Sequence, residues 1–307
     1  MSGRLQGKVV CVTGAGRGIG REVALQVATL GGGVVVADYG GAVDTSDAER
    51  VPVAEEVVRE IRAAGGEAVA TGEDVSTMAG GEQIVRAAID AFGRIDAMVC
   101  CAGILIESDL LHVTEAEWDR AAAVHLKGHF SCMQAATRQM LDQGAGGRLV
   151  FFASSTALAG SPDRPAYAAM KAGVMGLALS CAAALEGSGI TSNCVVPRAA
   201  TRMTDHVVTN LSETPPGQLP SEAAKNQALD PANIAPVVAY LLTDEAAGIN
   251  GQVFGSVGYQ MARLAPATWS QTLERDRRWT VDDLAEAVPQ TFGSDLGYRP
   301  FHWEYTE

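Results

Sequence analysis

The sequence predicts an α/β protein with a doubly wound, parallel sheet of seven strands and helices on both faces. Short apolar runs alternate with longer helical patterns from the start of the chain to about residue 255. The runs show no polar alternation, which is typical of strands buried on both faces of a parallel sheet. A glycine-rich turn follows the first run directly. The expected strands are Val9–Val12, Val34–Ala37, Ala68–Ala70, Ala97–Cys101, Leu149–Ala153, Thr191–Val196 and Gln252–Phe254.

We expect one domain followed by a C-terminal extension. No break in composition and no internal repeat divides residues 1–258, which are predicted to form a single domain. Residues 259–307 are the extension, which we expect to pack on the same domain because aromatic residues gather at Phe301–Tyr305. A capping-box pattern at Thr280–Asp283 predicts a helix within it. The segment Tyr39–Pro52 is longer than an ordinary connection between a strand and a helix.

The composition excludes several classes of protein. The chain is 47% hydrophobic and 19% charged, as in soluble globular proteins. Its formal charge of −13 disfavours binding to nucleic acids or to anionic membranes. The sequence has no uninterrupted apolar stretch of transmembrane length and no signal-peptide pattern at its start, so we expect a cytoplasmic protein. The six cysteines lie mostly in apolar runs without zinc-ligand spacing, so we expect buried thiols and no metal.

The glycine-rich turn predicts a dinucleotide site of the Rossmann type. The segment Thr13–Gly20 joins the first strand to a helix, where glycines let backbone N–H groups approach a pyrophosphate at the helix N-terminus. The spacing is not G-x-G-x-x-G, because the third glycine of that pattern would fall at Ile19. It reads instead as T-G-x-x-x-G-x-G. The cofactor contacts predicted from this turn are Gly14, Arg17, Gly18, Ile19 and Gly20.

Two acidic residues at strand ends complete the predicted adenosine half of the site. Asp38 lies 20 residues after Gly18 and closes the second strand, where a carboxylate accepts hydrogen bonds from both ribose hydroxyls. The same charge repels a 2′-phosphate and favours NAD over NADP, although Arg17 offers a cation to that phosphate. Asp74, followed by Val75, is placed to meet the adenine edge. Its position fits a helix N-cap equally well.

Three further residues predict proton chemistry. Tyr167 and Lys171 are four residues apart on an expected helix and therefore share one face. An ammonium there is expected to lower the phenol pKa from about 10 and make the tyrosine usable as an acid and a base. Ser154, at the end of the fifth strand, is expected to hydrogen-bond a substrate carbonyl oxygen.

With these motifs the chain resembles the short-chain dehydrogenase/reductases over about residues 5–258. The resemblance implies that Ser154, Tyr167 and Lys171 are catalytic and that a hydride passes to or from the nicotinamide. It also implies that Lys171 binds the nicotinamide ribose. Asn193 and Pro197 match the family pattern at the end of the sixth strand. The remaining cofactor contacts that it implies are Ala102, Gly103, Tyr167, Lys171 and Pro197.

The chain departs from the family pattern at three places. Cys100-Cys101 stands where the family has two asparagines, and Arg198 follows Pro197 in place of glycine. His125 occupies the position of a fourth catalytic asparagine. It is interpreted either as part of a proton relay or as a buried structural histidine. A metal pair with His129 is disfavoured, since no acidic third ligand is near in the sequence.

A closer resemblance concerns the substrate. The loop after Asp38, His125, the run Pro197–Thr204 and the continuation past Gly258 resemble the (3R)-hydroxyacyl-CoA dehydrogenase unit of peroxisomal multifunctional β-oxidation enzymes and stand-alone bacterial relatives. This predicts an NAD-dependent enzyme that interconverts a (3R)-3-hydroxyacyl-CoA and a 3-oxoacyl-CoA. The alternatives are a hydroxysteroid dehydrogenase, with a steroid in place of the acyl thioester, and a catalytically silent dinucleotide-binding regulator. The apolar helices Trp118–Met140 and Ala166–Ala184 predict a homodimer or homotetramer.

Overall fold

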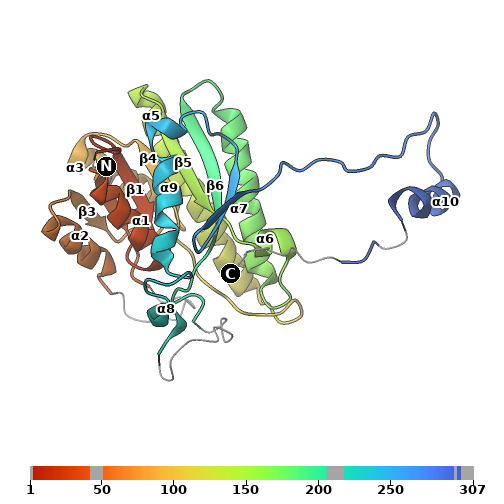
Figure 1. Cartoon of the computed structure of the whole chain (residues 1–307), viewed down its shortest axis with the longest axis horizontal. Coiled ribbons are helices and arrows are strands. Elements are labelled where there is room, and N and C mark those ends of the chain that lie inside the picture. Colours follow the sequence, from red (N-terminus) through yellow and green to blue (C-terminus); the bar gives the residue numbers. More distant parts are fainter. Residues whose placement is uncertain (1–2, 42–50, 206–217, 294–295, 299–307) are drawn as a thin grey trace.

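An eight-stranded sheet forms the centre of the protein, in the order β3-β2-β1-β4-β5-β6-β7-β8 (Figure 1). The structure is a computed structural model of the 307-residue chain and describes residues 3–41, 51–205, 218–293 and 296–298. Strands β1 to β7 pair in parallel, as predicted. The strands are β1 Val9–Thr13, β2 Gly33–Ala37, β3 Ala68–Thr71, β4 Ala97–Cys100, β5 Gly147–Phe152, β6 Ile190–Arg198, β7 Val253–Val257 and β8 Gln260–Arg263.

The prediction of seven strands is wrong by one strand, because β8 pairs antiparallel with β7. A two-residue turn at Gly258 and Tyr259 reverses the chain, and Gly258 has a φ of +55° that favours glycine. The strand that follows lies at the edge of the sheet, and three of its four residues are exposed. It therefore lacks the buried apolar run that identified the other strands.

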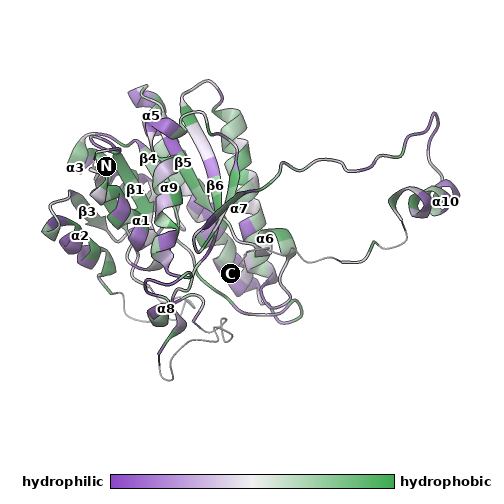
Figure 2. Cartoon of the chain, in the orientation of Figure 1, coloured by the Kyte–Doolittle hydropathy of each residue, from purple (hydrophilic) through white to green (hydrophobic). Residues whose placement is uncertain are grey.

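Helices cover both faces of the sheet, and successive strand residues face opposite layers. Val10 and Val12 pack with α1, α2 and α9, whereas Val9 and Cys11 pack with α3, α5 and α7. In Figure 2 the central strands carry mainly hydrophobic residues. The helices are α1 Gly18–Thr29, α2 Val53–Ala63, α3 Met78–Phe92, α4 Glu115–Ala121, the π-helix η1 Ala122–Lys127, α5 Gly128–Gln143, α6 Thr156–Ala159, α7 Pro165–Ala184, α8 Pro220–Ala223, α9 Ala235–Leu241 and α10 Val281–Phe292.

Helix α7 is the one helix of the described residues with the length and apolar composition to cross a membrane. In the structure it covers β5 and β6, and its buried face includes Val174 and Ala178. The hydroxyl of Ser192 on β6 donates to the carbonyl of Ala178, 2.7 Å away. Its apolar composition is thus that of a core helix, which also carries Tyr167 and Lys171.

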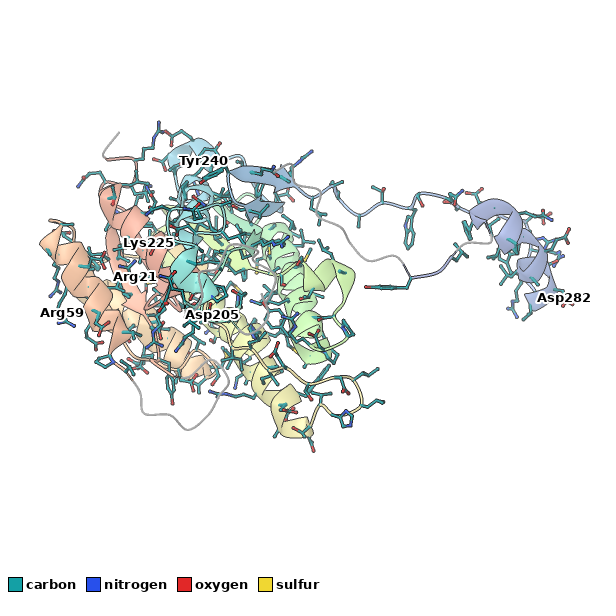
Figure 3. All side chains as sticks on the ribbon, turned by 60° about the horizontal axis from the view of Figure 1, so that its bottom comes forward. Arg21, Arg59, Asp205, Lys225, Tyr240 and Asp282 are labelled. Atoms are coloured by element: carbon teal, nitrogen blue, oxygen red, sulfur yellow. The ribbon has the colours of Figure 1, made fainter. Side chains whose placement is uncertain are left out.

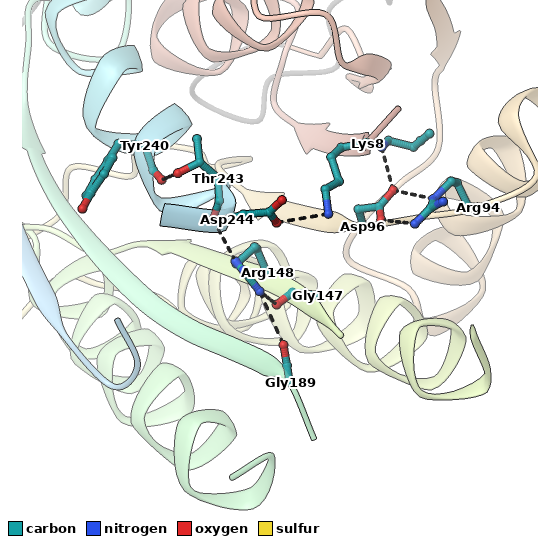
Figure 4. Close-up of polar contacts among 10 residues, drawn as sticks. Lys8, Arg94, Asp96, Gly147, Arg148, Gly189, Tyr240, Thr243 and Asp244 are labelled. Carbon is teal, nitrogen blue, oxygen red and sulfur yellow. Dashed lines mark hydrogen bonds and ion pairs between the residues drawn. The ribbon is translucent and has the colours of Figure 1, made fainter. Parts of the chain in front are cut away.

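Charged side chains fasten the amino ends of the strands (Figure 4). Asp96, which is buried, accepts hydrogen bonds from the backbone N–H of Val9, 2.8 Å away, and from the guanidinium of Arg94. Lys8 pairs with Asp244 at 3.2 Å. Arg148 donates to the backbone carbonyls of Gly147, Gly189 and Thr243. We call Lys8, Arg94, Asp96, Arg148 and Asp244 the amino-edge cluster.

The C-terminal extension leaves the domain after β8. Helix α10 has no buried residue and lies away from the body (Figure 1), and packing of residues 259–307 on the same domain stays a prediction. Figure 3 shows the side chains of α10, Asp282 among them, directed into solvent. Val281 and Leu284 are exposed because no described part of this chain covers them. Further along, the Tyr298 hydroxyl donates to the carbonyl of Ala159 on α6. The aromatic segment 301–305 lies outside the described residues.

Candidate active site

A cavity of about 490 Å³ opens at the carboxyl ends of β1, β2, β4, β5 and β6. The strand order reverses there, between β1 and β4, which is where open α/β sheets bind ligands. The predicted catalytic residues Ser154 and His125 lie outside the lining of this cavity. Every residue predicted to bind the cofactor lines it, namely Gly14, Arg17, Gly18, Ile19, Gly20, Asp38, Asp74, Val75, Ala102, Gly103, Tyr167, Lys171 and Pro197.

The turn after β1 leaves no room for side chains. Gly14 has a φ of +65°, and a Cβ there would lie 2.8 Å from the Cα of Ala102. A Cβ on Gly20 would lie 2.2 Å from the carbonyl oxygen of Gly14. Helix α1 begins at Gly18, so its free N–H groups face the cavity. This backbone cradle can hold a pyrophosphate against the positive end of the helix.

Asp38 connects the turn to the end of β2. One carboxylate oxygen accepts the N–H of Gly16 at 2.9 Å, and the other accepts the N–H of Gly40 at 2.8 Å. A carboxylate has about four acceptor sites, so it can still accept two ribose hydroxyls. Asp38 therefore has a structural role that sequence reasoning missed, in addition to its place in the cavity.

Asp74 is not a helix N-cap. Its carboxylate accepts the N–H of Ser76 at 2.9 Å, whereas the cap of α3 is Thr77, whose hydroxyl accepts the N–H of Gly80 at 2.9 Å. The neighbouring Val75 is held by the hydroxyl of Ser131 on α5, which donates to its carbonyl at 2.7 Å. The carboxylate side of this turn lines the cavity, so the adenine-edge interpretation of Asp74 stays open as a prediction.

Thr13 anchors the loop after β4, and sequence reasoning did not find it. Its hydroxyl oxygen accepts the N–H groups of Cys101 and Ala102, each at 3.1 Å. Thr13 is the first residue of the motif T-G-x-x-x-G-x-G, and this position in the motif could have indicated its structural role. Asn193, by contrast, does not line the cavity. Its amide donates to the carbonyl of Ile249 at 2.7 Å and ties β6 to the chain before β7.

Lys171 and Tyr167 project from α7 toward the end of β5. The ammonium of Lys171 donates to the carbonyl of Phe152 at 2.8 Å and lies 5.7 Å from the centre of the Tyr167 ring. Burial of Lys171 lowers its pKa to about 8. The expectation that Lys171 lowers the phenol pKa is wrong for this structure. Burial raises the Tyr167 pKa, and the opposing effects come from a hydrogen bond with Ser154 and from the charge of Arg164.

Ser154 lies at the carboxyl end of β5, beside the phenol of Tyr167. Its hydroxyl oxygen accepts the backbone N–H of Thr156 at 3.3 Å and faces the hydroxyl of Thr156 at 3.0 Å. The hydroxyl groups of Ser154, outside the cavity lining, and of Tyr167, within it, therefore lie side by side. They can hold and protonate a single oxygen atom of a substrate.

His125 lies in the π-helix η1, behind the cavity wall. Its Nε2 is 2.8 Å from the carbonyl oxygen of Ile104, which fixes Nε2 as the protonated nitrogen. Its ring meets that of Tyr167 edge-on, with centroids 5.1 Å apart. Burial and the charge of Lys171 lower the pKa of His125 to about 3, so the ring is neutral, and the relay and structural interpretations both stay predictions. Its neighbour Gly103 must be glycine, since a Cβ would lie 2.8 Å from the imidazole.

The two vicinal cysteines differ in their surroundings. Cys100 is buried, whereas Cys101 is partly exposed and lines the cavity, which the expectation of buried thiols did not distinguish. Burial raises the pKa of Cys101 to about 12, so its thiol stays protonated at neutral pH. Within the described residues, no group of three or more His, Cys, Asp or Glu side chains could hold a metal ion.

The cavity fits a nicotinamide dinucleotide. The glycine cradle, with no space for a Cβ, lies between Asp38 on one side and Tyr167 with Lys171 on the other. A dinucleotide bound with its pyrophosphate on the cradle would place its ribose by Asp38 and its nicotinamide by Lys171 and Pro197. These are the residues that would hold the cofactor.

Known proteins match this chain over most of its length. The family model of the short chain dehydrogenases matches residues 8–212. Hydroxyacyl-CoA dehydrogenase ChsB1 of Mycobacterium tuberculosis is 34% identical over 296 residues, 94% of this chain and 89% of that protein. Peroxisomal multifunctional enzyme type 2 of Drosophila melanogaster is 39% identical over 256 residues, 83% of this chain and 40% of that enzyme.

Two further matches extend the comparison. The 3-oxoacyl-(acyl-carrier-protein) reductase FabG of Staphylococcus aureus is 38% identical over 246 residues, 80% of this chain and 94% of that reductase. A crystal structure of a short chain dehydrogenase from Mycobacterium avium matches with a TM-score of 0.82 at 33% identity. That match covers 97% of this chain and 99% of the other.

Proposed function

Because the chain belongs to the short chain dehydrogenase family, we propose that this oxidoreductase interconverts (3R)-3-hydroxyacyl and 3-oxoacyl thioesters of coenzyme A, with NAD as its cofactor. The observation that carries the reaction class is that Tyr167 and Lys171 line a glycine-cradled cavity, with the Ser154 hydroxyl beside the Tyr167 phenol. The complete trio disfavours a catalytically silent regulator. The substrate class is supported by relatives named as a hydroxyacyl-CoA dehydrogenase and as a peroxisomal multifunctional enzyme.

The residues of this chain supply the proton chemistry. When bound, the nicotinamide supplies or accepts the hydride at the substrate carbon. For reduction of a ketone, the phenol of Tyr167 gives its proton to the substrate oxygen, and Ser154 donates a hydrogen bond to the same oxygen. For oxidation of the alcohol, Tyr167 takes that proton back. Lys171, held by the carbonyl of Phe152, lies 5.7 Å from the centre of the Tyr167 ring and would hold the nicotinamide ribose.

The choice of NAD is supported by Asp38. A 2′-phosphate about 4 Å from this carboxylate would meet repulsion of roughly 4 kcal/mol per unit charge at an effective dielectric constant of about 20. Arg17 lines the same cavity and is partly exposed, so solvent screens its attraction for that phosphate to about 1 kcal/mol. The carboxylate outweighs the guanidinium in this comparison.

A spectrophotometric assay tests the proposed substrate. We expect reduced cofactor to form from (3R)-3-hydroxybutyryl-CoA and from longer (3R) thioesters, with little formed from the (3S) isomers. The acyl-carrier-protein thioester of the same acyl group is the second arm, because one relative is named for that carrier. Tyr167→Phe is the control for contaminating activity. Turnover of the carrier-protein thioester alone, or equal turnover of the two isomers, would refute the proposal.

We also propose assembly into a homodimer or homotetramer through the faces of α4, α5 and α7. Trp118, Phe130 and Leu179 lie on these helices and are 41%, 37% and 47% exposed. Apolar side chains gathered on neighbouring helices mark a surface that a second subunit can cover. Light scattering at micromolar concentration should give a multiple of 31.9 kDa. A mass of a single chain would contradict the proposal.

A further inference from the structure

The geometry points to Thr156 as a positioning residue that fixes Ser154 as a hydrogen-bond donor in the reaction. Thr156 is the first residue of α6, two positions after Ser154. Its hydroxyl lies 3.0 Å from the Ser154 hydroxyl oxygen, and its backbone N–H points to the same atom at 3.3 Å. Thr156 contacts the Ser154 hydroxyl, which in turn lies beside the phenol of Tyr167, so Thr156 acts through Ser154.

The number of hydrogen bonds at Ser154 determines where its proton goes. A serine hydroxyl has one proton to donate and two lone pairs that accept. The backbone N–H of Thr156 uses one lone pair, and the hydroxyl of Thr156 uses the other. The Ser154 hydroxyl is then left to donate its proton in a hydrogen bond to the phenol of Tyr167 or to a substrate oxygen. The hydrogen bond from Ser154 that lowers the Tyr167 pKa agrees with this direction.

The hydroxyl of Thr156 strengthens this donor without losing its own proton. Hydrogen bonds that follow one another from Thr156 to Ser154 to an acceptor polarise each other in a partly buried site. No bond to Thr156 forms or breaks during the reaction. The proton that reaches the substrate oxygen comes from Tyr167, and Ser154 and Thr156 return unchanged after each turnover. Thr156 thereby favours the state in which Ser154 stabilises negative charge on oxygen.

The same contacts could serve only to start α6, since serine hydroxyls often accept a backbone N–H two residues on. The chain offers substitutions that separate the two roles. Thr156→Val keeps the shape of the side chain and the backbone N–H but removes the hydroxyl. Thr156→Ser keeps the hydroxyl. Ser155→Ala removes an exposed neighbouring hydroxyl and is the matched control.

Steady-state kinetics of thioester turnover are the first arm, and this arm rests on the proposed function. We expect Thr156→Val to lower kcat about tenfold, as for loss of one hydrogen bond to a reacting group, with the KM for NAD unchanged. Thr156→Ser and Ser155→Ala should stay within about twofold of the wild type. In the oxidation direction, the rise of kcat with pH should move to higher pH in Thr156→Val, because the Ser154 hydroxyl is no longer held in the direction that favours the phenolate of Tyr167.

An absorbance titration of tyrosine ionisation is the second arm and needs no substrate. The difference between each protein and its Tyr167→Phe counterpart isolates one phenol among the six tyrosines. We expect this phenol to ionise at higher pH in Thr156→Val than in the wild type or in Thr156→Ser. If the wild type turns over no thioester, the proposed function fails and the titration alone decides this inference. Equal titration curves for Thr156→Val and the wild type would overturn it.

Discussion

The two edges of the sheet use similar side chains for opposite purposes. At the amino edge, Asp96 accepts hydrogen bonds from Val9 and Arg94, and Arg148 donates to three backbone carbonyls. At the carboxyl edge, Lys171 is buried and its ammonium donates to the carbonyl of Phe152. Charged groups at the first edge are bonded to the protein itself, whereas those at the second face a cavity. Side chains at the amino edge stabilise the sheet, whereas side chains at the carboxyl edge are placed to bind a ligand.

The open arrangement at the carboxyl edge costs stability. Lys171 has no carboxylate partner among the described residues, so its buried ammonium is poorly solvated, and its lowered pKa reflects that cost. At the amino edge, the buried Asp96 is compensated by hydrogen bonds from the backbone N–H of Val9 and from the guanidinium of Arg94. Substitutions should therefore divide into those that change activity and those that change stability, according to the edge.

Tyr167→Phe should lower activity more than any other substitution and leave stability almost unchanged. Removing the phenolic hydroxyl deletes the acid and base of the reaction, so kcat should fall by about 10²–10⁴-fold. The melting temperature should stay close to that of the wild type, because the ring and its edge contact with His125 remain. Turnover assays and thermal unfolding on the same preparations measure both. A variant that keeps its activity would place the chemistry elsewhere.

Lys171→Met should reveal the stability cost at the carboxyl edge through its pH dependence. The unfolded chain keeps the lysine proton to about pH 10.5, whereas the folded protein loses it near pH 8. Over this interval the unfolded state binds more protons, so the free energy of unfolding of the wild type rises with pH, by about 3 kcal/mol. Lys171→Met lacks this rise. Urea unfolding of both proteins from pH 7 to 10 measures the difference between their free energies of unfolding. A difference that does not change with pH would show that the pKa of Lys171 is not lowered in the folded protein.

Asp96→Ala, at the amino edge, should lower stability without changing activity. The substitution leaves the N–H of Val9 and the guanidinium of Arg94 without this acceptor, which should cost about 3 kcal/mol of stability. The kcat should be unchanged, since the cluster lies at the far end of the strands. Asp244→Ala is the control within the cluster. It breaks an exposed pair with Lys8 that contributes at most about 1 kcal/mol. Equal losses in the two variants would mean that burial of Asp96 is unimportant.

Substitution of Asp38 should give the smallest effect. This residue belongs to both groups, because it accepts backbone N–H groups of the turn and also lines the cavity. The wild type should favour NAD over NADP by at least tenfold in kcat/KM, through ribose hydrogen bonds and repulsion of the 2′-phosphate. Asp38→Asn removes the charge and keeps an acceptor for only one of the N–H groups of Gly16 and Gly40, so it should narrow the preference for NAD and weaken the turn. Parallel kinetics with the two cofactors test this. Equal efficiency of NAD and NADP in the wild type would show that Asp38 turns away from the ribose.

The sequence by itself predicted the parallel sheet and the part of the cavity lining that comes from the glycine-rich turn and from helix α7, because these depend on local patterns. Buried parallel strands appear as unbroken apolar runs, and close backbone approach requires glycine, as at Gly14 and Gly20. Tyr167 and Lys171 share a helix face through their spacing of four residues. Each of these signals lies within a few consecutive residues, so it can be recognised without knowledge of the fold.

Only the tertiary structure decided which partner each polar group has. Thr13 holds Cys101 across 88 residues, and His125 holds Ile104 across 21, so no local pattern could pair them. The same holds for the direction of the Lys171 ammonium, which the fold turns to the carbonyl of Phe152. A hydrogen bond depends on the position of both groups in space. The chain specifies its elements through neighbouring residues, whereas the pKa values and donor roles at the site follow from how those elements pack.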